Sequence, residues 1–160
     1  MKTYLVTGGS GFIGSNFIRF LLHKNADFRV VNLDKLTYAG NPANLHDIER
    51  DDRYTFVHGD ICDAEVVGEL FRNRKPDVVI NFAAESFVDR SILDANPFLV
   101  SNIRGTYTIL DIVKNQNKKL IHISTDEVFG SLENENADEN FKFNTETDNQ
   151  LNFALKLLNG

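Results

Sequence analysis

The segment Thr7-Gly8-Gly9-Ser10-Gly11-Phe12-Ile13-Gly14 decides the fold that this chain is expected to adopt. The apolar run that leads into it, residues 4–7, is typical of a buried strand. Apolar residues then recur at helical spacing over residues 12–22. The glycines at 8, 11 and 14 therefore join a strand to a helix. In such a loop the first glycine permits a tight turn, the second lets backbone approach a pyrophosphate, and the third lets helix pack on strand.

An acidic residue supports this interpretation. Asp34 directly follows the second expected strand, residues 29–33, and lies 20 residues beyond the last glycine of the loop. A carboxylate there can accept hydrogen bonds from both hydroxyls of an adenine-side ribose, and it would repel a 2′-phosphate. The N–H groups of Phe12 and Ile13 would point at the phosphates from the start of the helix. The pattern predicts a dinucleotide site that prefers NAD to NADP, although Lys35 beside the acid weakens that preference.

Strand and helix patterns continue to alternate along the chain. Apolar runs predict three more strands, at residues 54–57, 77–82 and 119–124. Helical spacing predicts one helix that ends before Pro76 and a long helix that begins at Pro97. The long helix is expected to present on one side Leu99, Val100, Ile103, Tyr107, Leu110 and Val113. Repeated β-α-β units of this kind predict an α/β fold, a doubly wound Rossmann parallel sheet with helices on both faces.

Further candidate residues stand where strands end, because open α/β sheets bind ligands at the carboxyl ends of their strands. Asp60 follows the third expected strand, and Ala83 and Ala84 end the fourth. Two simpler interpretations stay open. Asp60 could instead cap the following helix, and two small residues at a strand end could simply serve packing.

Composition narrows the class of protein. The 160 residues are 42% apolar and 25% charged, which suits one globular domain, and the net charge of −6 argues against unspecific binding to nucleic acid or to an anionic membrane. No apolar stretch reaches the roughly 20 residues that a membrane helix needs. The single cysteine, Cys62, excludes an intramolecular disulfide and a clustered cysteine site, and the four histidines have no spacing that suggests a metal. A cytoplasmic protein without a metal is expected.

The chain changes character after Gly130. Residues 131–160 carry six acids, two lysines and seven asparagines. We therefore expect a Rossmann domain over residues 1–130, followed by an acidic, Asn-rich tail over residues 131–160 with a short helix near residues 148–158.

Four segments carry a resemblance to a known family. The glycine loop resembles that of extended short-chain dehydrogenases/reductases that act on nucleotide sugars. Residues 33–41 (LDKLTYAGN), 83–91 (AAESFVDRS) and 124–130 (STDEVFG) are similar to the corresponding segments of the dTDP-glucose 4,6-dehydratase branch. The resemblance covers roughly residues 1–130. It implies NAD as cofactor, dTDP-glucose as substrate and a homodimer.

Motif and resemblance together give the candidate residues. The expected cofactor contacts are Gly8, Gly11, Phe12, Ile13, Gly14, Asp34, Lys35, Leu36, Thr37, Asp60, Ile61, Phe82, Ala83, Ala84 and Ser101. The resemblance implies that Ser86 and Thr125 contact the substrate.

The resemblance also implies a reaction. Family members oxidise the sugar at C4 by hydride transfer to NAD, eliminate water across C5 and C6, and return the hydride to C6. Thr125 would then hydrogen-bond near the C4 oxygen, Asp126 would protonate the departing C6 hydroxyl, and Glu127 would remove the C5 proton. A dry site can keep one of two adjacent carboxyls protonated while the other is charged.

Two positions depart from the family pattern. Phe87 stands where a histidine is usual, and Asn152 stands four residues before Lys156, where the family has its catalytic tyrosine. Asparagine cannot act as the base. The sequence therefore predicts a dehydratase that lacks the C-terminal substrate domain, shortened or degenerate, that binds NAD but turns over little sugar. The alternatives are a non-catalytic module that pairs with a full-length homologue, and a related nucleotide-sugar epimerase, against which Glu127 after Asp126 argues.

Overall fold

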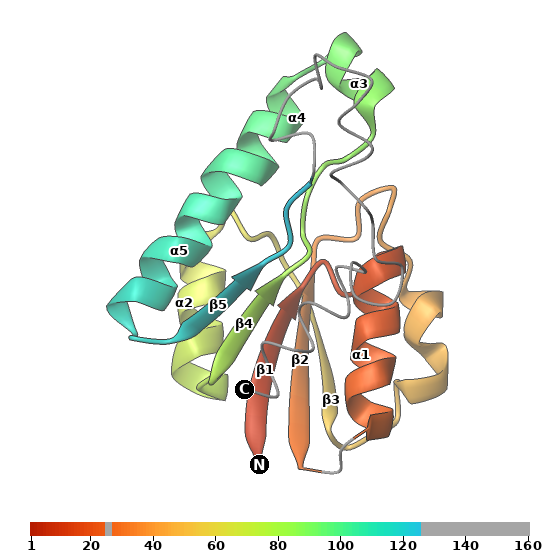
Figure 1. Ribbon diagram of the computed structural model, residues 1–160, viewed down its shortest axis with the longest axis vertical. Coiled ribbons are helices and arrows are strands. Elements are labelled where there is room, and N and C mark those ends of the chain that lie inside the picture. Colours follow the sequence, from red (N-terminus) through yellow and green to blue (C-terminus); the bar gives the residue numbers. More distant parts are fainter. Residues whose placement is uncertain (25–26, 126–160) are drawn as a thin grey trace, which may run out of the picture. The chain divides into compact units, whose positions relative to one another are not determined.

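The computed structural model describes residues 1–24 and 27–125 (Figure 1). The chain divides into two units, Met1–His122 and Ile123–Gly160, and the fold described below is that of the first unit. Its strands are β1 (Lys2–Thr7), β2 (Phe28–Asp34), β3 (Tyr54–His58), β4 (Val78–Asn81) and β5 (Lys119–His122). Its helices are α1 (Phe12–Lys24), the 3-10 helix η1 (Pro42–Ile48), α2 (Ala64–Arg74), α3 (Val88–Leu93), α4 (Asn96–Phe98), the π-helical η2 (Leu99–Gly105) and α5 (Thr106–Asn115).

The five strands form one parallel sheet in the order β3-β2-β1-β4-β5 (Figure 1). This confirms the predicted Rossmann fold. The chain starts in the middle with β1, builds outward through β2 and β3, and then crosses back to place β4 on the other side of β1. The strand order therefore reverses between β1 and β4. In open α/β sheets a ligand crevice forms at such a reversal, outside the carboxyl ends of the strands.

Both faces of the sheet are covered, because alternate residues of each strand point to opposite sides. Leu5 pairs in register with Val31 and with Val79. These three side chains share one buried cluster with residues of α2 and α5, namely Val67, Leu70, Phe71, Ile109 and Val113. On the opposite face, α1 packs against β1, β2 and η1 and buries Phe17, Ile18, Leu21 and Leu22. The near-continuous apolar character of the central strands follows from this double coverage.

A chain of polar side chains crosses the neighbouring strands β1, β4 and β5 near their carboxyl ends. The Thr7 hydroxyl donates to Oδ1 of Asn81, whose Nδ2 donates to Nδ1 of His122 over 3.0 Å. Thr7 and Asn81 are buried, and burial lowers the pKa of His122. The contact with Asn81 makes Nδ1 of the imidazole an acceptor, so these bonds suit the neutral form of His122.

The segment after β4 differs from the sequence expectation. Helix α3 was not predicted; it is six residues long, and it buries none of them. The helix expected from Pro97 is present, but its predicted single apolar face is wrong. Val113 is buried against the sheet, whereas four of the expected residues are exposed, namely Leu99, Ile103, Tyr107 and Leu110. The turns of η2 are π-helical, so they do not have the α-helical period that the prediction assumed.

Two absences apply to the described part of the chain. Within residues 1–24 and 27–125, no helix combines the length and the apolar character that crossing a bilayer would require. Within the same residues, no three side chains of His, Cys, Asp or Glu gather closely enough to hold a metal ion.

Candidate dinucleotide-binding site

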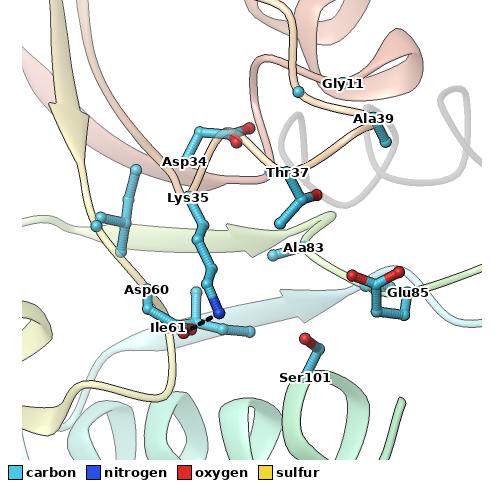
Figure 2. A pocket seen from close by; sticks show the side chains of 15 residues that line it. Gly11, Asp34, Lys35, Thr37, Ala39, Asp60, Ile61, Ala83, Glu85 and Ser101 are labelled. Carbon is cyan, nitrogen blue, oxygen red and sulfur yellow. Dashed lines mark ion pairs between the residues drawn. The ribbon is translucent and has the colours of Figure 1, made fainter. Parts of the chain in front are cut away.

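A cleft lies where the carboxyl ends of β1, β2, β3 and β4 meet, with η2 along its side (Figure 2). Each strand contributes the residues that directly follow it, so the cleft coincides with the reversal of strand order. Its lining residues are Gly8, Gly11, Leu33, Asp34, Lys35, Thr37, Ala39, Gly40, Gly59, Asp60, Ile61, Ala83, Ala84, Glu85 and Ser101.

The glycine loop takes its shape from two close approaches. Gly8 has a φ of 69°, in the left-handed region that favours glycine, and a Cβ there would lie 2.6 Å from the backbone nitrogen of Ala83. A Cβ on Gly14 would lie 2.4 Å from the carbonyl oxygen of Gly8, so glycine lets α1 approach the loop. Helix α1 begins directly after the loop, and the first N–H groups of a helix have no intrahelical acceptor. These groups and the helix dipole favour an anion at this end.

Ser10 holds the glycine loop to the segment after β2. Its backbone nitrogen donates to Oδ2 of Asp34 over 2.8 Å, and its hydroxyl accepts from Nδ2 of Asn32 over 3.2 Å. Its carbonyl oxygen accepts from the backbone nitrogen of Asn41 and from Nδ2 of Asn44, each over 3.0 Å. Ser10 is fully buried, and its bonds to Asp34 and Asn32 are buried with it. They fix the loop position before any ligand binds.

Asp34 ends β2 with its carboxylate held on both sides. Oδ2 accepts from Ser10, and Oδ1 accepts from the backbone nitrogen of Leu36 over 2.8 Å. The residue is buried but lines the cleft. Each carboxylate oxygen has a second lone pair, so Asp34 can still accept hydroxyl donors from a ligand.

Asp60 follows β3 and forms an ion pair across the cleft. Its Oδ1 accepts from the backbone nitrogen of Cys62 over 2.9 Å, and its Oδ2 lies 2.7 Å from Nζ of Lys35 (Figure 2). Burial alone would raise the pKa of Asp60, but the hydrogen bonds from Lys35 and Cys62 lower it overall. The same pair raises the pKa of Lys35. Asp60 does not cap α2, as the simpler interpretation held, because Asp63 is the N-cap and accepts from the backbone nitrogens of Glu65 and Val66.

Ser101 reaches the cleft because its neighbour is tied to the loop after β4. The amide of Asn102 accepts from the backbone nitrogen of Glu85 over 2.8 Å and donates to the carbonyl oxygen of Glu85 over 2.9 Å. This two-way contact sets η2 against the loop. It places Glu85 and Ser101 together on the wall opposite Asp34 (Figure 2).

The expected cofactor residues fall into two groups. Ten of them line the cleft, namely Gly8, Gly11, Asp34, Lys35, Thr37, Asp60, Ile61, Ala83, Ala84 and Ser101. The other five lie beside it. Phe12 and Ile13 are exposed at the start of α1, and Gly14 is buried beneath the loop. The backbone of Leu36 has a φ of 55°, in the left-handed region. The ring of Phe82 packs against the ring of Phe17 on α1, with 5.2 Å between the two ring centroids.

Sequence reasoning did not select five lining residues, namely Leu33, Ala39, Gly40, Gly59 and Glu85. Each adjoins a residue that was selected or lies in a segment that carried the resemblance, so sequence proximity was the available signal. Ser86 is exposed after β4 and does not line the cleft. Thr125 belongs to the second unit, whose placement relative to the cleft is not described, and Asp126 and Glu127 lie outside the described residues.

The lining suits a dinucleotide. A Cβ on Gly11 would meet only two backbone oxygens, the nearer at 3.3 Å, so this position leaves the cleft floor open. The small side chains of Ala83 and Ala84 leave room for a flat ligand against backbone. A cleft that has the glycine loop directly before the N-terminus of α1 and the held carboxylate of Asp34 in its lining fits a pyrophosphate flanked by a ribose.

Comparison with known proteins identifies the relatives of the chain. The sequence model of the GDP-mannose 4,6 dehydratase family matches residues 5–147. The dTDP-glucose 4,6-dehydratase of Haemophilus influenzae is 49% identical over 142 residues, which cover 82% of this chain and 42% of that protein.

Two crystal structures of dTDP-glucose 4,6-dehydratases are also similar. The Streptomyces venezuelae enzyme with NAD bound has a TM-score of 0.76 and 47% identity, over 82% of this chain and 42% of that one. The Bacillus anthracis enzyme in complex with NAD has a TM-score of 0.75 and 41% identity, over 82% and 40%. The chain therefore spans about 40% of the length of these relatives.

Proposed function

The chain belongs to the GDP-mannose 4,6 dehydratase family, and from this premise we propose that it is the NAD-binding part of a dTDP-glucose 4,6-dehydratase. Its relatives at 41–49% identity carry that name, and two of them were crystallised with NAD. The proposed reaction converts a dTDP-hexose to its 4-keto-6-deoxy form. The same identities favour a dehydratase over an epimerase.

One observation carries the cofactor proposal. The cleft joins Gly8 and Gly11 of the glycine loop, the second of which directly precedes α1, to the held carboxylate of Asp34. NAD supplies reversible storage of a hydride when it is bound. The residues proposed to hold it are the ten that line the cleft, together with the N–H groups of Phe12 and Ile13 at the start of α1.

The sugar chemistry is proposed for residues after β5. Thr125 would hydrogen-bond near the C4 oxygen, Asp126 would protonate the leaving hydroxyl at C6, and Glu127 would remove the proton at C5. Ser86, exposed after β4, would contact the substrate. The support for these roles is the match of residues 124–130 to the family motif.

We further propose that the 160 residues alone turn over little sugar. The support is the sequence around Lys156, where Asn152 occupies the position of the family's tyrosine base. An amide cannot take the proton from the C4 hydroxyl. We also propose that residues 131–160 form an acidic tail separate from a Rossmann domain over residues 1–130.

A pair of glycine variants tests the cofactor proposal. Gly11 lines the cleft, and a Cβ there would lie 3.3 Å from the carbonyl oxygen of Gly8, a tight contact that a backbone shift of a few tenths of an ångström relieves. In Gly11→Val the fold is therefore expected to persist, as circular dichroism would check, and NAD binding to be lost. Gly68→Ala, on α2, is the control, because its added Cβ meets only the end of the Arg72 side chain. NAD-dependent thermal shifts report binding. A shift that persists in Gly11→Val, or is missing in the unaltered protein, would sink the proposal.

The turnover proposal has its own assay. The purified protein is incubated with NAD and dTDP-glucose, and the 4-keto-6-deoxy product is measured by mass spectrometry. We expect product far below that formed by an equal amount of a full-length relative. An equal rate would show that Asn152 does not prevent the reaction.

A second candidate role has structural support. Leu99, Ile103, Tyr107 and Leu110 form an exposed apolar stripe at spacings of four, four and three residues along η2 and α5. We propose that this stripe contacts a second copy of the chain, or a full-length homologue in the case of a non-catalytic module. Ile103→Asp should then abolish association in size-exclusion chromatography, while Ile92→Asp on exposed α3 should not. If the protein is a monomer and does not bind the full-length homologue, both the contact with a second copy and the contact with a homologue are contradicted.

A further inference from the structure

A lysine beside the ribose-binding carboxylate poses a question of cofactor choice. The carboxylate of Asp34 is positioned to accept a hydrogen bond from the 2′-hydroxyl of an adenine-side ribose and to repel a 2′-phosphate. Lys35 follows it directly, and a basic residue at this place is the usual means of accepting the 2′-phosphate of NADP. Whether the site can discriminate therefore depends on where the ammonium of Lys35 lies.

The structure places that ammonium away from Asp34. The side chain of Lys35 extends across the cleft to Asp60, with 2.7 Å between Nζ and Oδ2 (Figure 2). Asp60 is held to receive it, because its other oxygen accepts from the backbone nitrogen of Cys62 over 2.9 Å. The carboxylate of Asp34 is fixed separately by the backbone nitrogens of Ser10 and Leu36, so it cannot turn to follow the lysine.

The charges around the cleft favour this arrangement. Three carboxylates line it, on Asp34, Asp60 and Glu85, and Lys35 is the one lysine or arginine among the lining residues of the described chain. The hydrogen bond to Asp60 raises the pKa of Lys35, and the more distant charge of Glu85 adds to this, so the side chain stays protonated. The ammonium is thus engaged on the β3 side of the cleft.

We infer that the Lys35–Asp60 ion pair determines cofactor choice by withholding the Lys35 ammonium from the 2′ position of the adenine-side ribose. Asp34 then faces that position without a nearby counter-charge and discriminates against NADP. Asp60 acts through Lys35 in this role and is a specificity-determining residue. The inference rests on the proposed function, because it requires that the cleft bind NAD.

Breaking the pair should loosen the discrimination. Asp60→Asn keeps the oxygen that accepts from Cys62 but removes the charge that holds Lys35. The freed ammonium can then reach a 2′-phosphate. Kd values for NAD and for NADP are measured by isothermal titration calorimetry on the full chain. We expect the ratio of Kd for NADP to Kd for NAD to fall about fivefold, the size typical of one partly exposed charge interaction.

A lysine-free background separates the two effects of this substitution. Loss of the negative charge at Asp60 could by itself strengthen the binding of NADP. It could also weaken the binding of both cofactors through the adenine that they share. In Lys35→Met the inference expects a ratio within about twofold of the unaltered protein, because the lysine is already withheld. Adding Asp60→Asn to Lys35→Met should then leave the ratio unchanged. Asp47→Asn is the matched control, because it breaks the 2.8 Å Arg19–Asp47 pair outside the cleft lining.

If Asp60→Asn lowers the ratio of Kd for NADP to Kd for NAD equally with and without Lys35, the inference is overturned, because the carboxylate of Asp60 alone would then be responsible. An unchanged ratio in Asp60→Asn, or a large change in Lys35→Met alone, would also overturn it. Should Asp60→Asn fail to fold by circular dichroism, the Lys35→Met result still decides, because a contributing lysine would already change the ratio there. Failure of the unaltered protein to bind NAD would instead contradict the proposed function.

Discussion

Two regions of the first unit are held in different ways. The anchored loops, residues 8–11, 34–40 and 59–63, follow β1, β2 and β3 and are tied by buried hydrogen bonds, by an ion pair and by a capped helix. The exposed segment, residues 87–103, begins with a helix that has no side-chain cap, and it leaves large apolar side chains in solvent, with Leu93 87% and Ile103 63% exposed. The difference shows that the cleft is built by interactions within this chain, whereas the exposed segment carries apolar surface that the described fold does not use.

The largest expected effect lies in the anchored loops. Gly8→Val places a β-branched residue at a φ of 69° and a Cβ 2.6 Å from the Ala83 backbone, which cannot move without disrupting β4. We expect the free energy of unfolding to fall by at least ~3 kcal/mol. Urea denaturation measures it. Gly68→Ala, in the middle of α2, should instead gain ~0.5–1 kcal/mol. A stable Gly8→Val protein would break the comparison.

Apolar truncations on the two sides should differ next in size. Val67 on α2 is fully buried, so Val67→Ala should cost ~2 kcal/mol of unfolding free energy. Ile103→Ala removes more atoms, but its side chain is exposed in the isolated chain, so in the monomer its cost in unfolding free energy should remain within ~0.5 kcal/mol. The same denaturation experiment compares them. A cost for Ile103→Ala that equals that for Val67→Ala would mean that the exposed segment is covered in solution.

Helix caps give a smaller contrast. Oδ1 of Asp63 accepts from the backbone nitrogens of Glu65 and Val66, so Asp63→Ala should cost ~1 kcal/mol. Phe87 occupies the same place on α3 without a side-chain hydrogen bond. Phe87→Asp should therefore leave stability unchanged or raise it by up to ~0.5 kcal/mol. Thermal melts of both variants measure the contrast, and a loss in Phe87→Asp would show that the aromatic ring has a structural role.

The smallest effect concerns pH and the last strand. Burial lowers the pKa of His122, so the unfolded chain binds this proton more tightly than the folded chain. The stability tied to neutral His122 is fully present above the unfolded pKa of about 6.5 and is lost as pH falls through the lower folded pKa. His122→Gln should lose less stability than the unaltered protein between pH 8 and pH 5. Identical pH profiles would mean that folding does not lower the pKa of His122.

Much of the anchored region could be predicted from sequence. The glycine spacing, the strand before it and Asp34 at the end of β2 are local signals, and each depends on residues close together in the chain. The alternation of strands and helices predicts a parallel sheet, and the structure gives the order of its strands. For this reason the fold, and the contribution of each strand end to the cleft, could be inferred from the amino-acid sequence alone.

The remaining features depend on contacts between distant residues. The pairing of Lys35 with Asp60 spans two strands, and the bonds between Glu85 and Asn102 join a loop to a helix 17 residues later. Neither leaves a pattern in the sequence. The apolar face expected after Pro97 was wrong for a related reason, because periodicity identifies apolar positions but not whether anything covers them.

The central claim is that NAD binds at the anchored loops. NMR titration of the 160-residue protein with NAD tests this claim most directly, because it follows the backbone amides of both regions in one experiment. The account predicts saturable shifts of the backbone amides in the anchored loops, with the largest changes at Gly11, Lys35 and Ile61 around the cleft. The backbone amide signals of Ile103 and Leu110, in the exposed apolar stripe, should not shift. A folded spectrum in which NAD shifts no amide of the anchored loops, or shifts only those of the stripe, would contradict it.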